Sequence, residues 1–259
     1  MRLKPLTADT YTDILTSKIL PIIGEIYADA LCRQDVLDWV TWAENTKTNH
    51  NKTYADATVK GWWRVVCLLV RDLAADFELP DPTVRVRSPA THIYDRCEKG
   101  TLSHDELGSL LDAVEQFYPQ RYAEVTMLAY TGIRAGELYA LHWTDIDSTR
   151  QCMTIRHSIS AGQITDTKTH AAREVYLPSP LPDILESHRR SMMAEQHPGL
   201  ATGLVFPSDK GTIRDGGSLR KALNCVAEYA QIDQRVTPQV LRRTFNTLLL
   251  AAGADRIVL

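Results

Sequence analysis

Two short segments, far apart in the chain, each place an arginine near the start of an expected helix. Residues 131–138 read Thr-Gly-Ile-Arg-Ala-Gly-Glu-Leu, and residues 239–244 read Gln-Val-Leu-Arg-Arg-Thr. A fold that brings Arg134 and Arg242 together lets them grip one phosphate from two directions, because a guanidinium is planar, permanently charged and suited to bidentate contact with phosphate oxygens. The two segments therefore predict a phosphate clamp, provided that their helix starts converge.

Local spacing adds a second residue to each segment. Thr237-Pro238 is a good helix start, with a capping hydroxyl followed by proline at the first helical position. Gln239 and Arg242 are three residues apart, so both can point into one site. Arg134 and Glu137 have the same spacing, which lets the carboxylate orient the guanidinium. The alternative for this second pair is a surface ion pair worth under about 1 kcal/mol.

Composition places the chain among ordinary globular proteins, with 44% hydrophobic and 24% charged residues. The apolar runs are much shorter than the roughly 20 residues that span a bilayer, and no signal peptide opens the chain, so we expect a cytoplasmic protein with no membrane partner. Five scattered cysteines without a CxxC pair predict neither disulfides nor a metal site. The net charge of -3 argues mildly against a nucleic-acid partner, unless a local basic patch overrides it.

The first expected domain, residues 1–85, is helical. Its clearest helix is expected over residues 56–77, where Lys60, Arg64 and Arg71 form a basic stripe beside the apolar face. This stripe is a candidate nucleic-acid contact, and simple solvation of an exposed face explains it equally well.

The second expected domain, residues 92–259, follows a turn-rich linker and mixes helices with strands. A small antiparallel sheet is expected from the β-branched residues of segment 153–159 and the alternation in segment 173–177, whereas helices are expected over residues 181–195, 217–230 and 238–252. The fold class is therefore mainly α with a small antiparallel β-sheet.

The segment between these two strands contains Thr167-Lys168-Thr169. The order Thr-Gly-Ile-Arg-x-x-Glu-Leu, then Thr-Lys-Thr on a hairpin, then Leu-Arg-Arg-Thr-Phe closely resembles the tyrosine recombinases, or phage-type integrases. The resemblance implies that residues 1–85 form a helical core-binding domain that contacts DNA. It also implies that residues 92–259 form most of an α+β catalytic domain.

The resemblance assigns roles position by position. Arg134 and Arg242 become the two clamp arginines, with Glu137 in support, and Lys168 becomes the general acid toward the leaving 5′ oxygen. Gln239 stands where the family usually has histidine or lysine, and it can hydrogen-bond a phosphate oxygen without shuttling a proton. Arg243, a further supporting residue, stands where the family often has histidine.

The implied reaction uses no metal or nucleotide cofactor. The implied partner is double-stranded DNA, contacted by Lys60, Arg64 and Arg71, with tetramers of the chain assembled on paired recombination sites. Without the family match, an exposed hairpin lysine with no catalytic role is the better interpretation of Lys168.

The family's nucleophile is a tyrosine that lies C-terminal to the second arginine and forms a covalent phosphotyrosyl intermediate. No tyrosine follows Tyr229, which precedes Arg242. We therefore expect a C-terminally incomplete catalytic domain that binds DNA without cleaving it. One alternative is a natural relative that lacks the nucleophile and regulates recombination sites, and another is a protein whose arginines are structural and which binds no DNA.

Overall fold

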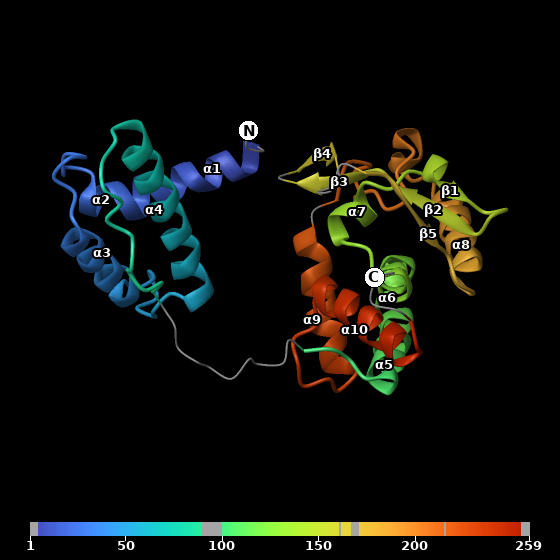
Figure 1. Cartoon of the computed structure of the whole chain (residues 1–259). Coiled ribbons are helices and arrows are strands. Elements are labelled where there is room, and N and C mark those ends of the chain that lie inside the picture. Colours follow the sequence, from blue (N-terminus) through green and yellow to red (C-terminus); the bar gives the residue numbers. More distant parts are fainter. Residues whose placement is uncertain (1–4, 90–99, 161, 167–170, 215, 255–259) are drawn as a thin grey trace. The chain divides into compact units, whose positions relative to one another are not determined.

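A computed structural model describes residues 5–89, 100–160, 162–166, 171–214 and 216–254 of the chain. The chain divides into two compact units, Met1–Arg96 and Cys97–Leu259 (Figure 1). In the described residues, no helix combines the length and the apolar character that crossing a membrane requires.

The first unit is helical. It contains α1 (Pro5–Ile14), a π-helical turn η1 (Leu15–Ile19), α2 (Leu20–Ile23), α3 (Arg33–Asn45) and α4 (Asp56–Asp76). Its core is built around Trp39, which is fully buried and stacks on Trp63 with ring centroids 6.1 Å apart. The indole N–H of Trp39 donates to the carbonyl of Lys18 at 2.9 Å, so this buried ring leaves no polar group unsatisfied.

The second unit combines helices with short strands. In chain order its elements are α5 (His104–Phe117), η2 (Pro119–Arg121), α6 (Tyr122–Thr131), α7 (Ala135–Tyr139), η3 (Trp143–Asp145), β1 (Ile146–Asp147), β2 (Cys152–Ile155), β3 (His157–Ser160), β4 (Gln163–Asp166), β5 (Arg173–Tyr176), α8 (Leu181–Ala194), η4 (Pro198–Thr202), α9 (Gly216–Tyr229) and α10 (Pro238–Ala251). The expected class, mainly α with a small antiparallel sheet, is confirmed. The strands form two sheets, β1-β2-β5 and the hairpin β3-β4, both antiparallel.

Helix α6 is the centre of the second unit. Every residue from Ala123 to Ala129 is buried, and the helix packs against α5, α8 and α10 (Figure 1). A helix buried on all sides needs an apolar sequence all round, and the segment Val125-Thr126-Met127-Leu128 meets that need because Thr126 donates its hydroxyl to the carbonyl of Tyr122. Because its neighbours come from distant parts of the chain, α6 fixes their mutual positions.

Gly132 ends α6 and turns the chain toward Arg134. Its φ of 59° lies in the left-handed region, where glycine carries no Cβ penalty, as expected of a residue that ends a helix. A Cβ at this position would also collide with the ring of Phe245 in α10. Glycine therefore permits both the turn and the close approach of α10.

Two contacts connect the beginning of the second unit to α10 and to the segment that precedes it. The N–H of Leu102 donates to the hydroxyl of Thr244 at 2.8 Å, and both residues are buried. The amide of Gln234 donates to the carbonyl of Thr101 at 2.7 Å. Immediately afterwards α5 begins with a capping box, in which Ser103 and Glu106 satisfy each other's backbone N–H groups.

A buried carboxylate joins α6 to the segment before α9. Glu124 lies 2.9 Å from Arg121 and 3.3 Å from Arg214, and the two arginine side chains are only 14% and 13% exposed. Arg214 also donates twice to the carbonyl of Pro207. Glu124 therefore compensates two guanidiniums that are almost removed from water.

We expect Glu124→Ala to lower the free energy of unfolding by about 3–5 kcal/mol, because it removes the buried counter-charge of two nearly buried guanidiniums and leaves Arg214 only the exposed Asp209. Chemical denaturation of the purified chain measures this loss. The control is Glu186→Ala in α8, which removes an exposed pair with Arg190 and should change stability by less than about 1 kcal/mol. Equal small effects in both variants would contradict the structural role of Glu124.

Candidate active site

The buried carboxylate of Glu137 organises the residues around the start of α7. Arg134 is the N-cap residue of α7, and its backbone N–H donates to Glu137 Oε2 at 2.9 Å. Its guanidinium donates to Glu137 Oε1 at 3.0 Å. The Glu137 side chain is 1% exposed, so the alternative of a surface ion pair does not hold. Glu137 fixes both the backbone and the side chain of Arg134.

A second guanidinium contacts the same carboxylate. Arg173, the first residue of β5, donates to Glu137 Oε1 at 3.1 Å and to Oε2 at 2.6 Å. The β2-β5 register pairs Arg173 with the buried Ile155, which holds the start of β5 in place. Arg173 is not among the site residues expected from the sequence. Its only signal in the sequence is a basic residue at the first position of a predicted strand.

Close packing between α7 and β3 supports this arrangement. A Cβ at Gly136 would lie 2.7 Å from the carbonyl oxygen of Ile159 and 2.7 Å from the hydroxyl of Ser158. Only glycine therefore allows α7 to lie this close to β3 without a shift of backbone. This contact sets the distance of α7, and therefore of Glu137, from the β3-β4 hairpin.

The ionised form of Glu137 is favoured. Burial by itself would raise the pKa of this carboxyl, but hydrogen bonds from Arg173 and from the Arg134 backbone, with the positive charge of Arg173, hold the pKa below its usual value. Glu137 is therefore a carboxylate at neutral pH and can orient two guanidiniums at once.

Arg242 joins the same group from α10. Its Nη1 donates to the carbonyl oxygen of Gly132, just before Arg134. Burial lowers the pKa of Arg242, and the positive charges of Arg134 and Arg173 lower it further, against the opposing effect of Glu137. An arginine remains protonated despite such a shift. The expected convergence of the two helix starts is therefore present in the structure.

We call Arg134 and Arg173, which share Glu137, together with Arg242, which contacts Gly132, the arginine cluster. The three guanidiniums and the Glu137 carboxylate together carry a formal charge of +2. Such a cluster favours a bound anion, because an anion relieves the repulsion among the guanidiniums and accepts their hydrogen bonds.

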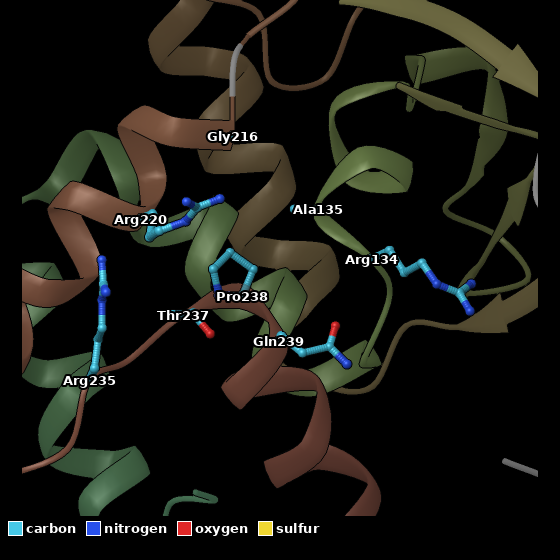
Figure 2. Close-up of a pocket in the computed structure, with 8 residues that line it drawn as sticks. All are labelled: Arg134, Ala135, Gly216, Arg220, Arg235, Thr237, Pro238 and Gln239. Carbon is cyan, nitrogen blue, oxygen red and sulfur yellow. The ribbon is translucent and has the colours of Figure 1, made fainter. Parts of the chain in front are cut away.

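Gln239 lies beside the arginine cluster. It is exposed at the beginning of α10 and lines, together with Arg134, a pocket of about 470 Å³. Figure 2 shows the Gln239 side chain extending from α10 toward the segment that carries Arg134. Thr237 caps the helix as expected, because its hydroxyl accepts from the N–H of Val240.

Two other expected residues are not placed in the cluster. Lys168 lies outside the described residues. Arg243 is partly buried, its Nε has no hydrogen-bond partner, and nothing in the described part of the chain joins it to the arginine cluster. In the same part of the chain, no group of three or more His, Cys, Asp or Glu side chains is arranged to hold a metal ion.

The expected basic stripe lies on α4 of the first unit. Arg64 and Arg71 are exposed, and Lys60 is partly exposed. Arg71 is 3.9 Å from Asp81, so part of its charge is compensated within the unit. Within the described residues, Lys60 and Arg64 have no such partner. They are the more available cations of the three.

Comparison with known proteins identifies relatives of the chain. The model of the phage integrase family matches residues 100–259. A tyrosine recombinase XerC-like protein of Caldanaerobacter subterraneus is 26% identical over 175 residues, which is 59% of this chain and 44% of that protein. The integrase of Staphylococcus phage L54a is 28% identical over 136 residues, which is 48% of this chain and 38% of that protein. The match thus spans less than half the length of each relative.

A solved structure shares the fold of the chain. The Tn1549 transposon integrase, solved in complex with a circular intermediate DNA, superimposes with a TM-score of 0.79 at 18% sequence identity. The match covers 99% of this chain and 85% of that one. At this level of identity the likeness establishes the architecture.

We expect Glu137→Gln to lower the free energy of unfolding at pH 7 by about 2–3 kcal/mol, less than for a fully buried pair because both arginines are partly exposed. The pKa of Glu137 is lower in the folded chain than in the unfolded one. Its contribution is therefore complete above the unfolded pKa of about 4.3 and is lost as the pH falls through the folded pKa. Denaturant unfolding of both proteins from neutral to acid pH should show their stabilities converging.

The matched control is Glu174→Gln, in which the exposed Glu174 loses its ion pair with the exposed Arg150. This change should cost less than about 1 kcal/mol. If the loss in Glu137→Gln were the same at acid and neutral pH, the carboxylate charge would not be its cause.

Proposed function

We propose that this chain, which belongs to the phage integrase family, is a tyrosine recombinase polypeptide that binds double-stranded DNA and holds one phosphodiester at the arginine cluster. The observation that carries the proposal is that Arg134 and Arg173 share the buried Glu137, while Arg242 donates to the carbonyl of Gly132, two residues before Arg134. Guanidiniums that are already oriented stabilise the charge that develops on non-bridging phosphate oxygens in a transition state.

The proposed chemistry is strand transfer through a phosphotyrosyl intermediate. The deprotonated oxygen of a tyrosine attacks the phosphorus, a bond from tyrosine to phosphate forms, and the bond to the 5′ oxygen breaks. Lys168 would give its proton to that leaving oxygen, and Gln239 would donate a hydrogen bond to a phosphate oxygen. The clamp arginines would hold the phosphate throughout.

We assign DNA contact to both domains. Residues 1–85 would act as the core-binding domain, with Lys60 and Arg64 of α4 as its phosphate contacts, and residues 92–259 would act as the catalytic domain. The DNA in the structure of the Tn1549 transposon integrase supports this assignment, because that chain has the same architecture over nearly the whole length of this one.

We further propose that residues 1–259 by themselves bind DNA without cleaving it, because no tyrosine follows Tyr229 in this sequence. A nicked suicide substrate, which traps the covalent intermediate, tests this. We expect a shifted non-covalent complex and no adduct that survives denaturation. A covalent adduct would identify a nucleophile elsewhere in residues 1–259.

The second candidate function is a DNA-binding regulator related to the recombinases. Gln239 favours it, because glutamine cannot move a proton where the family usually has histidine or lysine. The coding sequence downstream of Leu259 separates the two functions. If the reading frame continues and encodes Gly-His and a later tyrosine, the protein is a recombinase. If the frame encodes no such residues, the protein is the regulator.

We expect the salt dependence of DNA binding to become shallower when a phosphate contact is removed. The slope of log K against log salt should decrease by about 0.9 in Arg134→Ala and again in Arg64→Ala, because each variant releases one fewer counterion. Fluorescence anisotropy with a labelled duplex measures the slope. The control is Arg190→Ala, which removes an exposed cation of α8 that belongs neither to the arginine cluster nor to the basic stripe of α4. If the slope is unchanged in both test variants, Arg134 and Arg64 do not contact phosphates and have a structural role alone.

A further inference from the structure

The pocket beside Gln239 has the character of an anion site. We call it the α9-α10 pocket. Three arginines line it, namely Arg134, Arg220 and Arg235, and no acidic side chain of the described residues does. Figure 2 shows Arg220 and Arg235 on the side of the pocket away from Arg134, with Thr237 and Pro238 between them. The Arg134 side chain extends away from these two arginines in the same view, and its guanidinium donates to Glu137.

Two long helices also begin at this pocket. Gly216 opens α9 and Pro238 opens α10, both helices have 14 residues, and neither has an acidic residue in its first turn. A helix start carries a partial positive charge of about +0.5. Arg220, close to the start of α9, adds a cation where the helix itself favours an anion. An anion bound at this helix start would compensate the charge of Arg220.

The donors for such an anion are the arginines. Pro238 has no N–H, and the hydroxyl of Thr237 already satisfies the N–H of Val240. Arg220 and Arg235 are both exposed, and within the described residues neither makes a hydrogen bond or an ion pair. By contrast, Glu124 compensates the nearby Arg214. Arg220 and Arg235 are thus two cations of the α9-α10 pocket whose charge no described residue compensates.

The pocket is adjacent to the arginine cluster and distinct from it. Arg134 and Gln239 line the pocket, but Arg173 and Arg242 do not. Glu137 and Gly132 hold Arg134 and Arg242 at the cluster. An anion between Arg220 and Arg235 is therefore a second anion, with Arg134 and Gln239 between it and the first.

We propose that Arg220 and Arg235 bind a second backbone phosphate of the DNA strand whose phosphodiester lies at the arginine cluster. The proposal rests on the function proposed above and adds a separate contact to it. A phosphate contact carries no base information, but it fixes the position of the strand. Arg220 and Arg235 are therefore positioning residues that set which phosphodiester reaches Arg134 and Arg242.

The test replaces single phosphates of a duplex by neutral methylphosphonates, one position at a time, and measures the affinity of the whole chain. With the wild-type protein, we expect weaker binding when the phosphate in the α9-α10 pocket is neutralised. With the double variant Arg220→Ala, Arg235→Ala, that replacement should have no further effect. The salt slope of the double variant should be shallower by about 0.9 for each phosphate that the protein no longer neutralises.

The matched control is Lys221→Ala, which removes an exposed cation of α9 that does not line the pocket. It should leave the methylphosphonate profile unchanged. Because Arg220 and Arg235 are exposed, the double variant should unfold at the wild-type denaturant midpoint, which separates weaker DNA binding from a failure to fold.

The outcomes distinguish this inference from the proposed function. If the wild-type chain binds duplex DNA and Arg134→Ala weakens it, but the double variant keeps every methylphosphonate effect, the second phosphate site is wrong and the proposed function stands. Inorganic phosphate could bind at Arg220 while no single methylphosphonate substitution has an effect on DNA affinity that depends on Arg220 and Arg235. In that case the pocket binds a free anion, and the assignment to a DNA phosphate is wrong. If the wild-type chain binds no DNA, both proposals fail.

Discussion

The contact on which the site depends is the one between the Glu137 carboxylate and the two arginines that share it. Arg134 reaches it from the start of α7, and Arg173 reaches it from the start of β5. Without this charge, nothing would offset the repulsion of Arg134 and Arg173, which adds to burial in lowering the pKa of Arg242. The packing of α7 against β3 and the register of β5 thus bring several guanidiniums together. These guanidiniums are still able to bind an anion.

Much of the local structure around the site could be predicted from the sequence. The end of α6 at Gly132, the contact of Arg134 with Glu137, and the start of α10 at Thr237 all follow rules that act over three or four residues. Each uses a residue type with few alternatives at its position. The family resemblance added the order of the three motif segments along the chain. Rules that act over three or four residues contain no information about that order.

The contacts that sequence reasoning missed join residues that are far apart in the chain. Arg173 and Glu137 are separated by 36 positions, and their pairing depends on the register of β5. Arg220 and Arg235 resemble ordinary exposed cations until α9 and α10 are packed so that both helices begin at one pocket. The division of the strands into two sheets was missed for the same reason, since short strands contain little information about their partners.

The hydrogen bond between Leu102 and Thr244 has a consequence for the order in which the protein forms. The two residues are 142 positions apart, so this contact closes nearly the whole second unit. A ribosome must produce almost all of that unit before α10 can cover α6, and until then the apolar faces of α5 and α6 remain open to other chains. The arginine from α10 arrives with this last step. A nascent or partly folded molecule therefore carries no assembled anion site, and the ability to grip a phosphate appears only when the fold is closed.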